Sequence, residues 1–263
     1  GGAWSPLPSG DGQRLSLRGQ TNGKYFQAYN FSFTEPWLGG KKPNSLTVFM
    51  SHTLLGNGYL KRNANYEGIS ITGAGVVLGR RKKWPDDYFS LSTGINYTRY
   101  TLKEYPIDPI NLPNFSNGNV NNVNFRIALQ RTSIDQPTFP RTGSTFLLSA
   151  QLTPPFSLFD PNFGKRENPY QLLEYHKWRF NGEWFVPLGK PAGEEHNKQF
   201  VLRFAAKYGF LGRYNSSLGI SPFERFQVGD AGLTNQFALL GYDIIAHRGY
   251  PVYESSNPKV NPD

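Results

Sequence analysis

The sequence of 263 residues contains no cysteine. This absence excludes disulfide bonds and every metal or iron-sulfur site that is built from thiolates. Four histidines remain, and Glu194-Glu195-His196 lacks the second histidine that a helical zinc site would need. There is also no Gly-x-Ser-x-Gly elbow and no Asp/His pair with the spacing of a catalytic triad. We therefore expect no cofactor, no metal and no enzymatic activity.

The sequence also lacks extended apolar segments. The longest apolar stretch has only about ten residues, around Phe237 to Ala246, and the mean hydropathy is -0.52. A bundle of membrane-spanning helices is therefore excluded. A membrane barrel is not excluded, because its strands alternate lipid-facing and lumen-facing residues. The start, Gly1 to Leu7, lacks the basic and apolar regions of a signal peptide, and we expect that the natural N-terminus has been removed.

Basic residues outnumber acidic ones, with 28 Lys and Arg against 19 Asp and Glu, which gives a net charge of +9. A positive protein of this kind can face nucleic acid, lipid phosphate or a water-filled lumen. Charge alone therefore does not assign a partner.

What the chain does contain is a repeated alternation of apolar and polar residues. In the clearest case Val123, Phe125 and Ile127 alternate with Asn124 and Arg126. Such a period of two is typical of β-strands, and almost no segment shows helical spacing. Most of the segments have about nine to eleven residues, enough to cross a bilayer at a tilt. Nine segments follow the pattern, and they begin near Leu15, Tyr29, Leu46, Ile69, Phe89, Val123, Phe146, Trp178 and Phe200.

The connections between these strands alternate in length. Every second connection is short to medium and rich in proline, namely 36–44, 81–87, 133–142 and 187–199. The others mostly run longer, namely 53–67, 103–122, 154–174 and everything after 211, although 21–24 is a tight turn. A soluble β-sandwich would explain the alternation of residues equally well. Short turns on one side and long loops on the other favour an outer-membrane barrel.

Aromatic residues near strand ends fit the same hypothesis. We expect Trp37, Trp84, Tyr88, Tyr100 and Phe185 to form the aromatic girdles at the membrane interfaces. The basic run from Arg80 to Lys83 is interpreted as a solvated turn, with contact to lipid headgroups as an alternative.

Three landmarks in a fixed order are more specific than the strands. The first is Phe31-Ser-Phe-Thr-Glu-Pro-Trp37, and the second is Phe139-Pro-Arg-Thr-Gly-Ser144. The third is Pro222-Phe-Glu-Arg-Phe-Gln-Val-Gly229, followed after an insertion by His247-Arg-Gly-Tyr250. Together, from about residue 13 to about residue 250, they resemble the barrel of the outer-membrane protein assembly factors in the outer membrane protein 85 superfamily.

This resemblance implies an all-β fold, an antiparallel transmembrane β-barrel of the outer-membrane type. The family barrel has about sixteen strands and follows a set of periplasmic domains. The chain 1–263 is therefore expected to be a partial barrel of about nine strands over 13–210, the third to eleventh of the family. A long, lumen-directed extracellular loop would follow over 211–263. The periplasmic domains and the remaining strands, including the two that meet at the family's weak seam, are expected to be absent from it.

The resemblance also implies the functional residues of that loop. Arg248, Gly249 and Tyr250 would form its tip in the lumen, where a guanidinium can make paired hydrogen bonds to a wall carboxylate. Phe223, Glu224 and Phe226, with Gly229, would plug the lumen. The family usually has two glycines where this chain has Gly229-Asp230, and roughly 17 residues separate that point from the tip. The longer spacing suggests a loop extension.

The function implied by the resemblance is that of a non-enzymatic insertase in the Gram-negative outer membrane. Its expected partners are nascent outer-membrane β-barrel proteins, accessory assembly lipoproteins, and outer-membrane lipid and lipopolysaccharide, with no role for nucleic acid. Three alternatives stay open: a protein-secretion pore of the same superfamily, a passive or ligand-gated porin, and an outer-membrane enzyme such as a lipase barrel.

Overall fold

The structure is a computed structural model that describes residues 12–40, 44–105, 117–160, 162–165, 168, 170–192, 198–216, 220–228 and 241–245. The part of the chain so described is almost entirely β-structure. No helix within it is long and apolar enough to cross a membrane.

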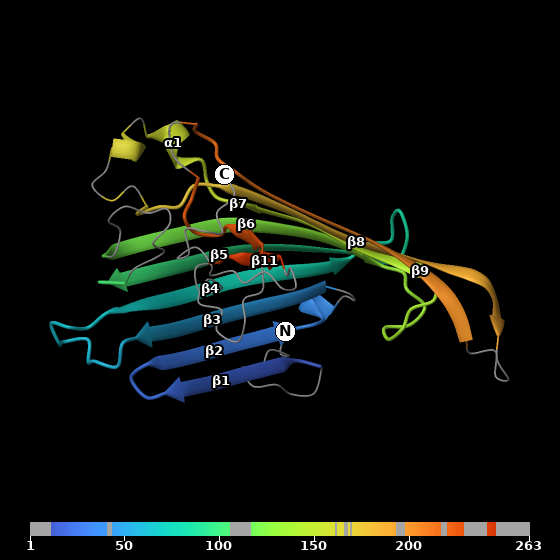
Figure 1. Ribbon diagram of the computed structural model, residues 1–263, viewed down its shortest axis with the longest axis horizontal. Coiled ribbons are helices and arrows are strands. Elements are labelled where there is room, and N and C mark those ends of the chain that lie inside the picture. Colours follow the sequence, from blue (N-terminus) through green and yellow to red (C-terminus); the bar gives the residue numbers. More distant parts are fainter. Residues whose placement is uncertain are drawn as a thin grey trace, which may run out of the picture.

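All nine predicted strands are confirmed, and they form one sheet in which each strand pairs with its neighbours in the sequence (Figure 1). Every pairing is antiparallel, and β1 and β9 are the two edges. The strands are β1 Arg14–Asn22, β2 Phe26–Glu35, β3 Asn44–Gly56, β4 Gly68–Arg81, β5 Phe89–Lys103, β6 Gly118–Thr132, β7 Gly143–Leu152, β8 His176–Ala192 and β9 Lys198–Gly212.

The register of the strands separates an apolar face from a polar face. Phe125 lies between Ile95 on β5 and Leu152 on β7, so apolar side chains form rows across the sheet. One position along, Asn124 lies beside Asn96 on the opposite face. Because successive side chains point to opposite faces, the alternation in the sequence becomes two continuous surfaces.

The apolar face is the exposed one. Leu17 is 73% exposed, Ile95 61% and Phe204 53%, and all three lie on this face. A soluble sandwich would bury such a surface against a second sheet, because contiguous apolar patches of this extent are rare on soluble proteins. The structure is instead an antiparallel transmembrane barrel wall of nine strands, with lipid-facing residues outward and an unclosed sheet.

Long and short connections lie at opposite ends of the sheet, as predicted (Figure 1). The long loops, at the left of the view, include α1 Phe156–Phe159 and the short helix η2 Phe163–Lys165. The short turns lie at the right, and the one after β2 contains the short helix η1 Leu38–Gly40. We call these the long-loop end and the short-turn end.

The connection expected over 187–199 was too long. β8 continues to Ala192 and β9 begins at Lys198, with Pro187 inside β8 and paired with Val201. β7 starts only at Gly143, opposite Phe185, so Pro187 lies past the paired part of β7. Proline is tolerated in a strand where no neighbour requires its missing N–H.

The prediction of a girdle position was also wrong for two residues, Tyr100 and Phe185. Tyr100 is 3% exposed and Phe185 lines a cavity, and both side chains belong to the polar face. The parity of their strands causes this, because the outward residues are odd-numbered in β5 and even-numbered in β8. Trp84 and Tyr88 are exposed at the short-turn end, as a girdle requires.

The buried core lies on the polar face near the long-loop end. Its members are inward residues of β4 to β6 together with residues from the long loops: Ile69, Tyr100, Leu102, Val120, Leu173, Tyr175 and Phe223. Two short parallel strands, β10 Phe226–Val228 and β11 Asp243–Ile245, lie over this face (Figure 1). The polar side of the wall is therefore the covered side.

Opposite substitutions on the two faces test this assignment. Phe125→Arg puts a charge on the apolar face in the middle of β6, whereas Ala128→Arg puts the same charge beside Ser92 and Ser149 on the polar face. In the natural full-length protein, folded into phospholipid vesicles, we expect Phe125→Arg to destabilise the folded state by about 2–4 kcal/mol. Ala128→Arg should cost much less. Equal losses, or the reverse order, would contradict a lipid-facing apolar surface.

Candidate functional site

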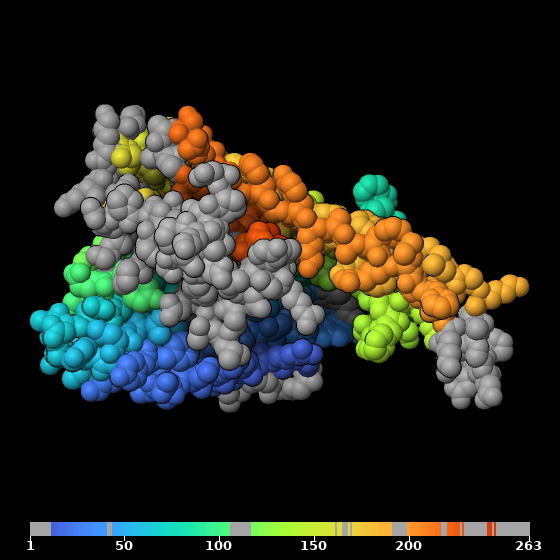
Figure 2. Space-filling model, viewed as in Figure 1, coloured from blue at the N-terminus to red at the C-terminus, as the bar shows by residue number. Residues whose placement is uncertain are grey.

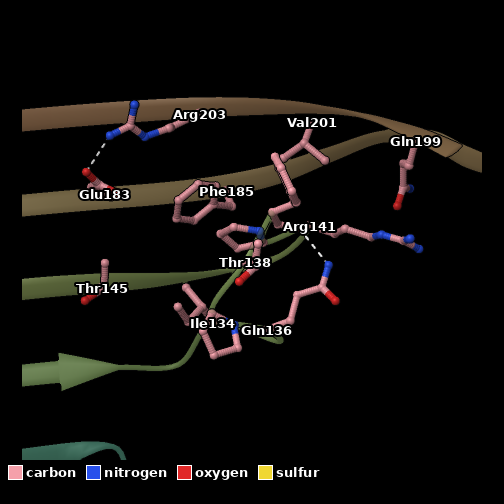
Figure 3. Close-up of a pocket in the computed structure, with 13 residues that line it drawn as sticks. Ile134, Gln136, Thr138, Arg141, Thr145, Glu183, Phe185, Gln199, Val201 and Arg203 are labelled. Atoms are coloured by element: carbon pink, nitrogen blue, oxygen red, sulfur yellow. Dashed lines mark hydrogen bonds and ion pairs between the residues drawn. The ribbon is translucent and has the colours of Figure 1, made fainter. Parts of the chain in front are cut away.

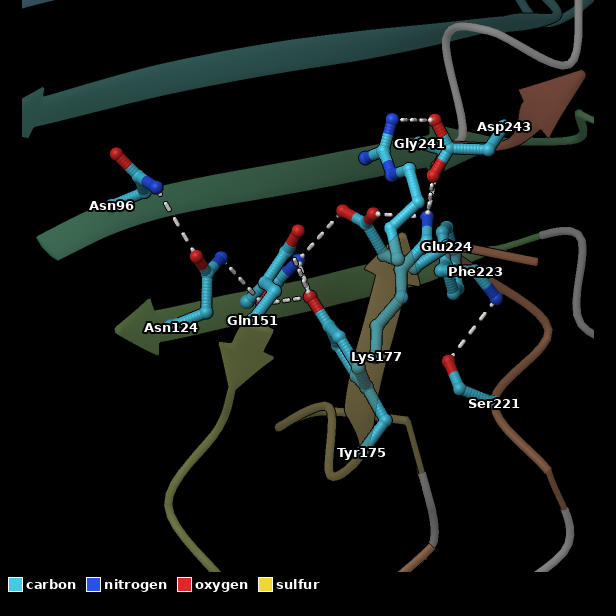
Figure 4. Close-up of polar contacts among 12 residues, drawn as sticks. Asn96, Asn124, Gln151, Tyr175, Lys177, Ser221, Phe223, Glu224, Gly241 and Asp243 are labelled. Atoms are coloured by element: carbon cyan, nitrogen blue, oxygen red, sulfur yellow. Dashed lines mark hydrogen bonds and ion pairs between the residues drawn. The ribbon is translucent and has the colours of Figure 1, made fainter. Parts of the chain in front are cut away.

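The candidate site is the place where the segment after β9 rests on the polar face of the sheet (Figure 4). We call residues 220–228 and 241–245 the docked segment. Its two parts are joined by the β10–β11 pair, in which the Asp243 N–H donates to the Arg225 carbonyl oxygen at 2.8 Å. The Tyr242 hydroxyl also donates to the Pro222 carbonyl oxygen at 2.6 Å. These bonds let the two parts act as one body against the wall.

Phe223 is the apolar anchor of the docked segment. Its side chain is fully buried, and its ring lies 4.8 Å from that of Tyr100, centroid to centroid. Val120 on β6 and Leu173 from the loop before β8 belong to the same cluster. Burying an aromatic side chain of this size contributes on the order of 2 kcal/mol. Phe223 therefore holds the segment at the long-loop end of the sheet.

Lys177 is the electrostatic centre of the site. Its side chain is 3% exposed on the polar face of β8, and its Nζ lies 2.5 Å from Asp243 Oδ2 and 3.3 Å from Glu224 Oε2. The ammonium also donates to the Gly241 carbonyl oxygen at 3.2 Å and lies 5.0 Å from the centre of the Phe226 ring. A buried cation requires such partners, since removing them leaves an uncompensated charge.

Arg179 extends the cationic surface by one step along β8. Its Nη1 lies 2.9 Å from Asp243 Oδ1, so the two oxygens of Asp243 contact two different cations. Lys177 and Arg179 share a face because they are two residues apart on one strand. A strand of alternating sequence thus builds a rigid receptor for one carboxylate.

Amide side chains carry the polar contacts across the sheet to Glu224. Asn96 Nδ2 donates to Asn124 Oδ1 at 3.2 Å, and Asn124 Nδ2 donates to Asn122 Oδ1 at 3.1 Å. Asn122 Nδ2 then donates to Glu224 Oε1 at 3.1 Å and to the Tyr175 hydroxyl oxygen at 3.0 Å. This network connects β5 and β6 with Oε1 of Glu224, while Lys177 on β8 donates to Oε2.

The backbone of the docked segment approaches its neighbours closely. Glu224 has a φ of +62°, and Gly241 has a φ of +78°. A Cβ atom at Gly241 would lie 2.5 Å from the Glu224 carboxyl carbon, so another residue there would have a strained backbone and would displace the Glu224 carboxylate. Burial raises the pKa of the Glu224 carboxyl, the Lys177 ammonium opposes this rise and the Asp243 carboxylate adds to it.

A second candidate lies at the short-turn end of the polar face. It is an open cavity of about 950 Å³ between the turn 133–142 and the inward residues of β8 and β9 (Figure 3). Two of its charged side chains pair with each other, because Arg203 Nη2 lies 2.5 Å from Glu183 Oε1. Gln136 Nε2 likewise donates to the Phe139 carbonyl oxygen at 2.7 Å. Because these polar groups are bonded to other groups of the protein, they do not point together at a ligand. The docked segment is therefore the stronger candidate.

The sequence-predicted residues divide into two groups. The structure brings Phe223, Glu224 and Phe226 together against the polar face. Their role as the plug of a closed lumen stays a prediction. Gly229 and the loop tip of Arg248, Gly249 and Tyr250 lie outside the described residues, and their roles also stay predictions.

Sequence reasoning missed the receptor side of the site. The alternation of the strand that begins near Trp178 places Lys177 and Arg179 on its polar face, but no sequence pattern shows what that face contacts. Asn122 and Tyr175 had no signal of their own. Asp243 had one, since it is the only acid in the most apolar stretch of the chain. A lone carboxylate in such a stretch indicates a paired or functional group.

Loss of the Lys177 ammonium should release the docked segment. In the natural full-length protein we expect Lys177→Met to lower the free energy of unfolding by on the order of 3 kcal/mol, because Glu224 loses its cation and Asp243 keeps only Arg179. Lys207→Gln is the matched control, since Lys207 is an exposed lysine on the polar face of β9. Chemical unfolding of Lys177→Met, Asp243→Asn and the double variant measures the coupling. Strictly additive losses would show that the two residues do not interact.

Comparisons with known proteins agree with this architecture. A family model described as the Omp85 superfamily domain matches residues 9–236. Among solved structures, the chain is similar to BamA from Haemophilus ducreyi lacking POTRA domains 1–3, with a TM-score of 0.54 and 20% sequence identity. The match covers 84% of this chain and 39% of that chain, so this chain spans well under half of the protein that it resembles. A search of curated proteins finds no match.

Proposed function

The chain belongs to the Omp85 superfamily, and from this premise we propose that it is part of the barrel of an insertase that assembles β-barrel proteins into the Gram-negative outer membrane. The family match over residues 9–236 is the observation that carries the proposal. The fold shared with BamA supports it, because the same wall of antiparallel strands is present. The proposed substrates are nascent outer-membrane β-barrel proteins.

The docked segment favours an assembly role over that of a simple porin. A passive pore needs an open, water-filled lumen, whereas here Phe223 and Glu224 cover the polar face of the wall through buried contacts. A covered lumen leaves the strands and the surrounding bilayer as the places where a substrate can be handled. Substrate strands could then add to the sheet through backbone hydrogen bonds.

The proposed mechanism requires no covalent chemistry. This chain would contribute a rigid wall. The ion pairs of Lys177 and Arg179 with Asp243 would hold the docked segment while other parts of the barrel open. Arg248 would pin the tip of the same loop to a carboxylate of the wall, with Gly249 allowing a sharp turn and Tyr250 packing beside it. Accessory assembly lipoproteins and outer-membrane lipid, including lipopolysaccharide, are the further proposed partners.

Reconstitution tests the proposed function. The natural full-length protein, placed in proteoliposomes with its accessory subunits, should speed the folding of an added outer-membrane β-barrel protein relative to empty liposomes. Lys177→Met should reduce this acceleration by about tenfold if the docked segment must stay seated, which corresponds to 1.4 kcal/mol. Lys207→Gln should leave it unchanged. Folding yield is read as the protease-resistant fraction of the substrate.

The same liposomes distinguish the alternatives. Steady ion conductance through the wild-type protein, with no acceleration of substrate folding, would identify a porin. Transport of a soluble protein across the bilayer without insertion would identify a secretion pore of the same superfamily. Either result would overturn the insertase proposal.

The loop tip yields a separate prediction. In cells that depend on the natural protein, Arg248→Ala should lower the amount of barrel protein in the outer membrane and lower the melting temperature of the purified variant, because a pinned guanidinium is lost. Arg62→Ala, at an exposed arginine in the connection between β3 and β4, is the control for loss of a loop arginine. Wild-type growth together with a wild-type melting curve for Arg248→Ala would refute the predicted role of the tip.

A further inference from the structure

The apolar face ends abruptly at the short-turn end of β4. Its outward side chains are Ala74, Val76 and Leu78, and the next outward position is Arg80. Two residues of a strand advance about 7 Å. Arg80 therefore lies one outward position beyond the last apolar side chain of β4, at the short-turn end of its apolar stretch.

The turn that follows carries a dense group of exposed cations. Arg80, Arg81, Lys82 and Lys83 are consecutive and all exposed, and Trp84 beside them is 85% exposed. Figure 2 shows this turn, in teal, standing out from the body of the molecule at the upper right. Arg81 Nε donates to the Asp87 carbonyl oxygen at 2.8 Å. Within the described residues, the side chains of Arg80, Lys82 and Lys83 have no hydrogen bond or ion pair.

The turn is held in place by Arg131 at the end of β6. The Arg131 guanidinium lies 2.9 Å from Asp86 Oδ2 and 5.6 Å from the centre of the Tyr88 ring. The other carboxylate oxygen of Asp86 accepts the Tyr88 N–H at 3.0 Å. Asp86 is thus occupied by groups other than the exposed cations. The turn keeps a net positive charge, with Asp87 as its one other acid.

We propose that Arg80, Lys82, Lys83 and Trp84 form a binding surface for anionic phospholipid headgroups in the leaflet at the short-turn end. This inference goes beyond the proposed insertase function, because it assigns a lipid class and a leaflet to a named turn. The chemistry is complementary: ammonium and guanidinium groups bind lipid phosphate, while the indole of an exposed tryptophan sits at the headgroup level. Each Lys or Arg near an anionic surface contributes about a fivefold gain in affinity.

Lipid retention tests this surface. The natural full-length protein is placed in nanodiscs of phosphatidylcholine and phosphatidylglycerol. Native mass spectrometry then counts the phosphatidylglycerol molecules that stay bound to the protein after it is released from the nanodisc. The triple variant Arg80→Gln/Lys82→Gln/Lys83→Gln should retain at least about fivefold less phosphatidylglycerol than the wild type. The charge-preserving variant Lys82→Arg/Lys83→Arg should retain as much as the wild type.

The matched control removes three exposed cations from the long-loop end: Lys24→Gln/Lys61→Gln/Arg62→Gln. It should change retention far less than the first triple variant. Equal retention by the wild type and the first triple variant would overturn the proposal, as would equal losses in both triple variants. Loss of the bound phosphatidylglycerol on addition of millimolar inorganic phosphate would also overturn it. The turn would then bind free anions rather than a lipid surface.

Discussion

The covered polar face depends on one buried cation. Lys177 is almost fully removed from solvent and contacts two carboxylates, a carbonyl oxygen and an aromatic ring, all from the docked segment. Each of these groups would be unfavourable alone in that position, because burying a charge without a partner costs several kcal/mol. The Lys177 ammonium and its partners in the docked segment therefore stabilise one another. The segment and the wall therefore form a site only when both are in place.

A second constraint is the parity of the strands. Lipid on one side and docked polypeptide on the other require every strand to present apolar residues outward and polar residues inward, and a shift of register by one residue would exchange the two. The long antiparallel ladders maintain this order from β1 to β9. The same parity places Lys177 and Arg179 side by side facing the docked segment, and Arg80 among the lipid-facing positions. The two proposed sites thus arise from one alternation.

The strands and their order could be predicted from the sequence because period two is a local signal that lipid and lumen both reinforce. Tyr100 shows where the prediction failed: its position at the end of a strand favoured a girdle, yet the parity already visible in Phe89, Leu91 and Tyr97 places it inward. Phe223, Glu224 and Phe226 were singled out through a family resemblance. Their receptor could not be, because the contact of Asp243 with Lys177 joins residues far apart in the chain, and no local pattern records such a pairing.

Solvent should reach the groups that hold the docked segment only slowly. Hydrogen-deuterium exchange of the natural full-length protein in lipid nanodiscs measures this directly, residue by residue, over 220–228 and 241–245. If the segment is seated as described, the Asp243 amide, which donates to the Arg225 carbonyl oxygen, should exchange as slowly as amides in the interior of β5 and β6. Exchange at the rate of an open surface loop would contradict the docked segment and the role given to Lys177.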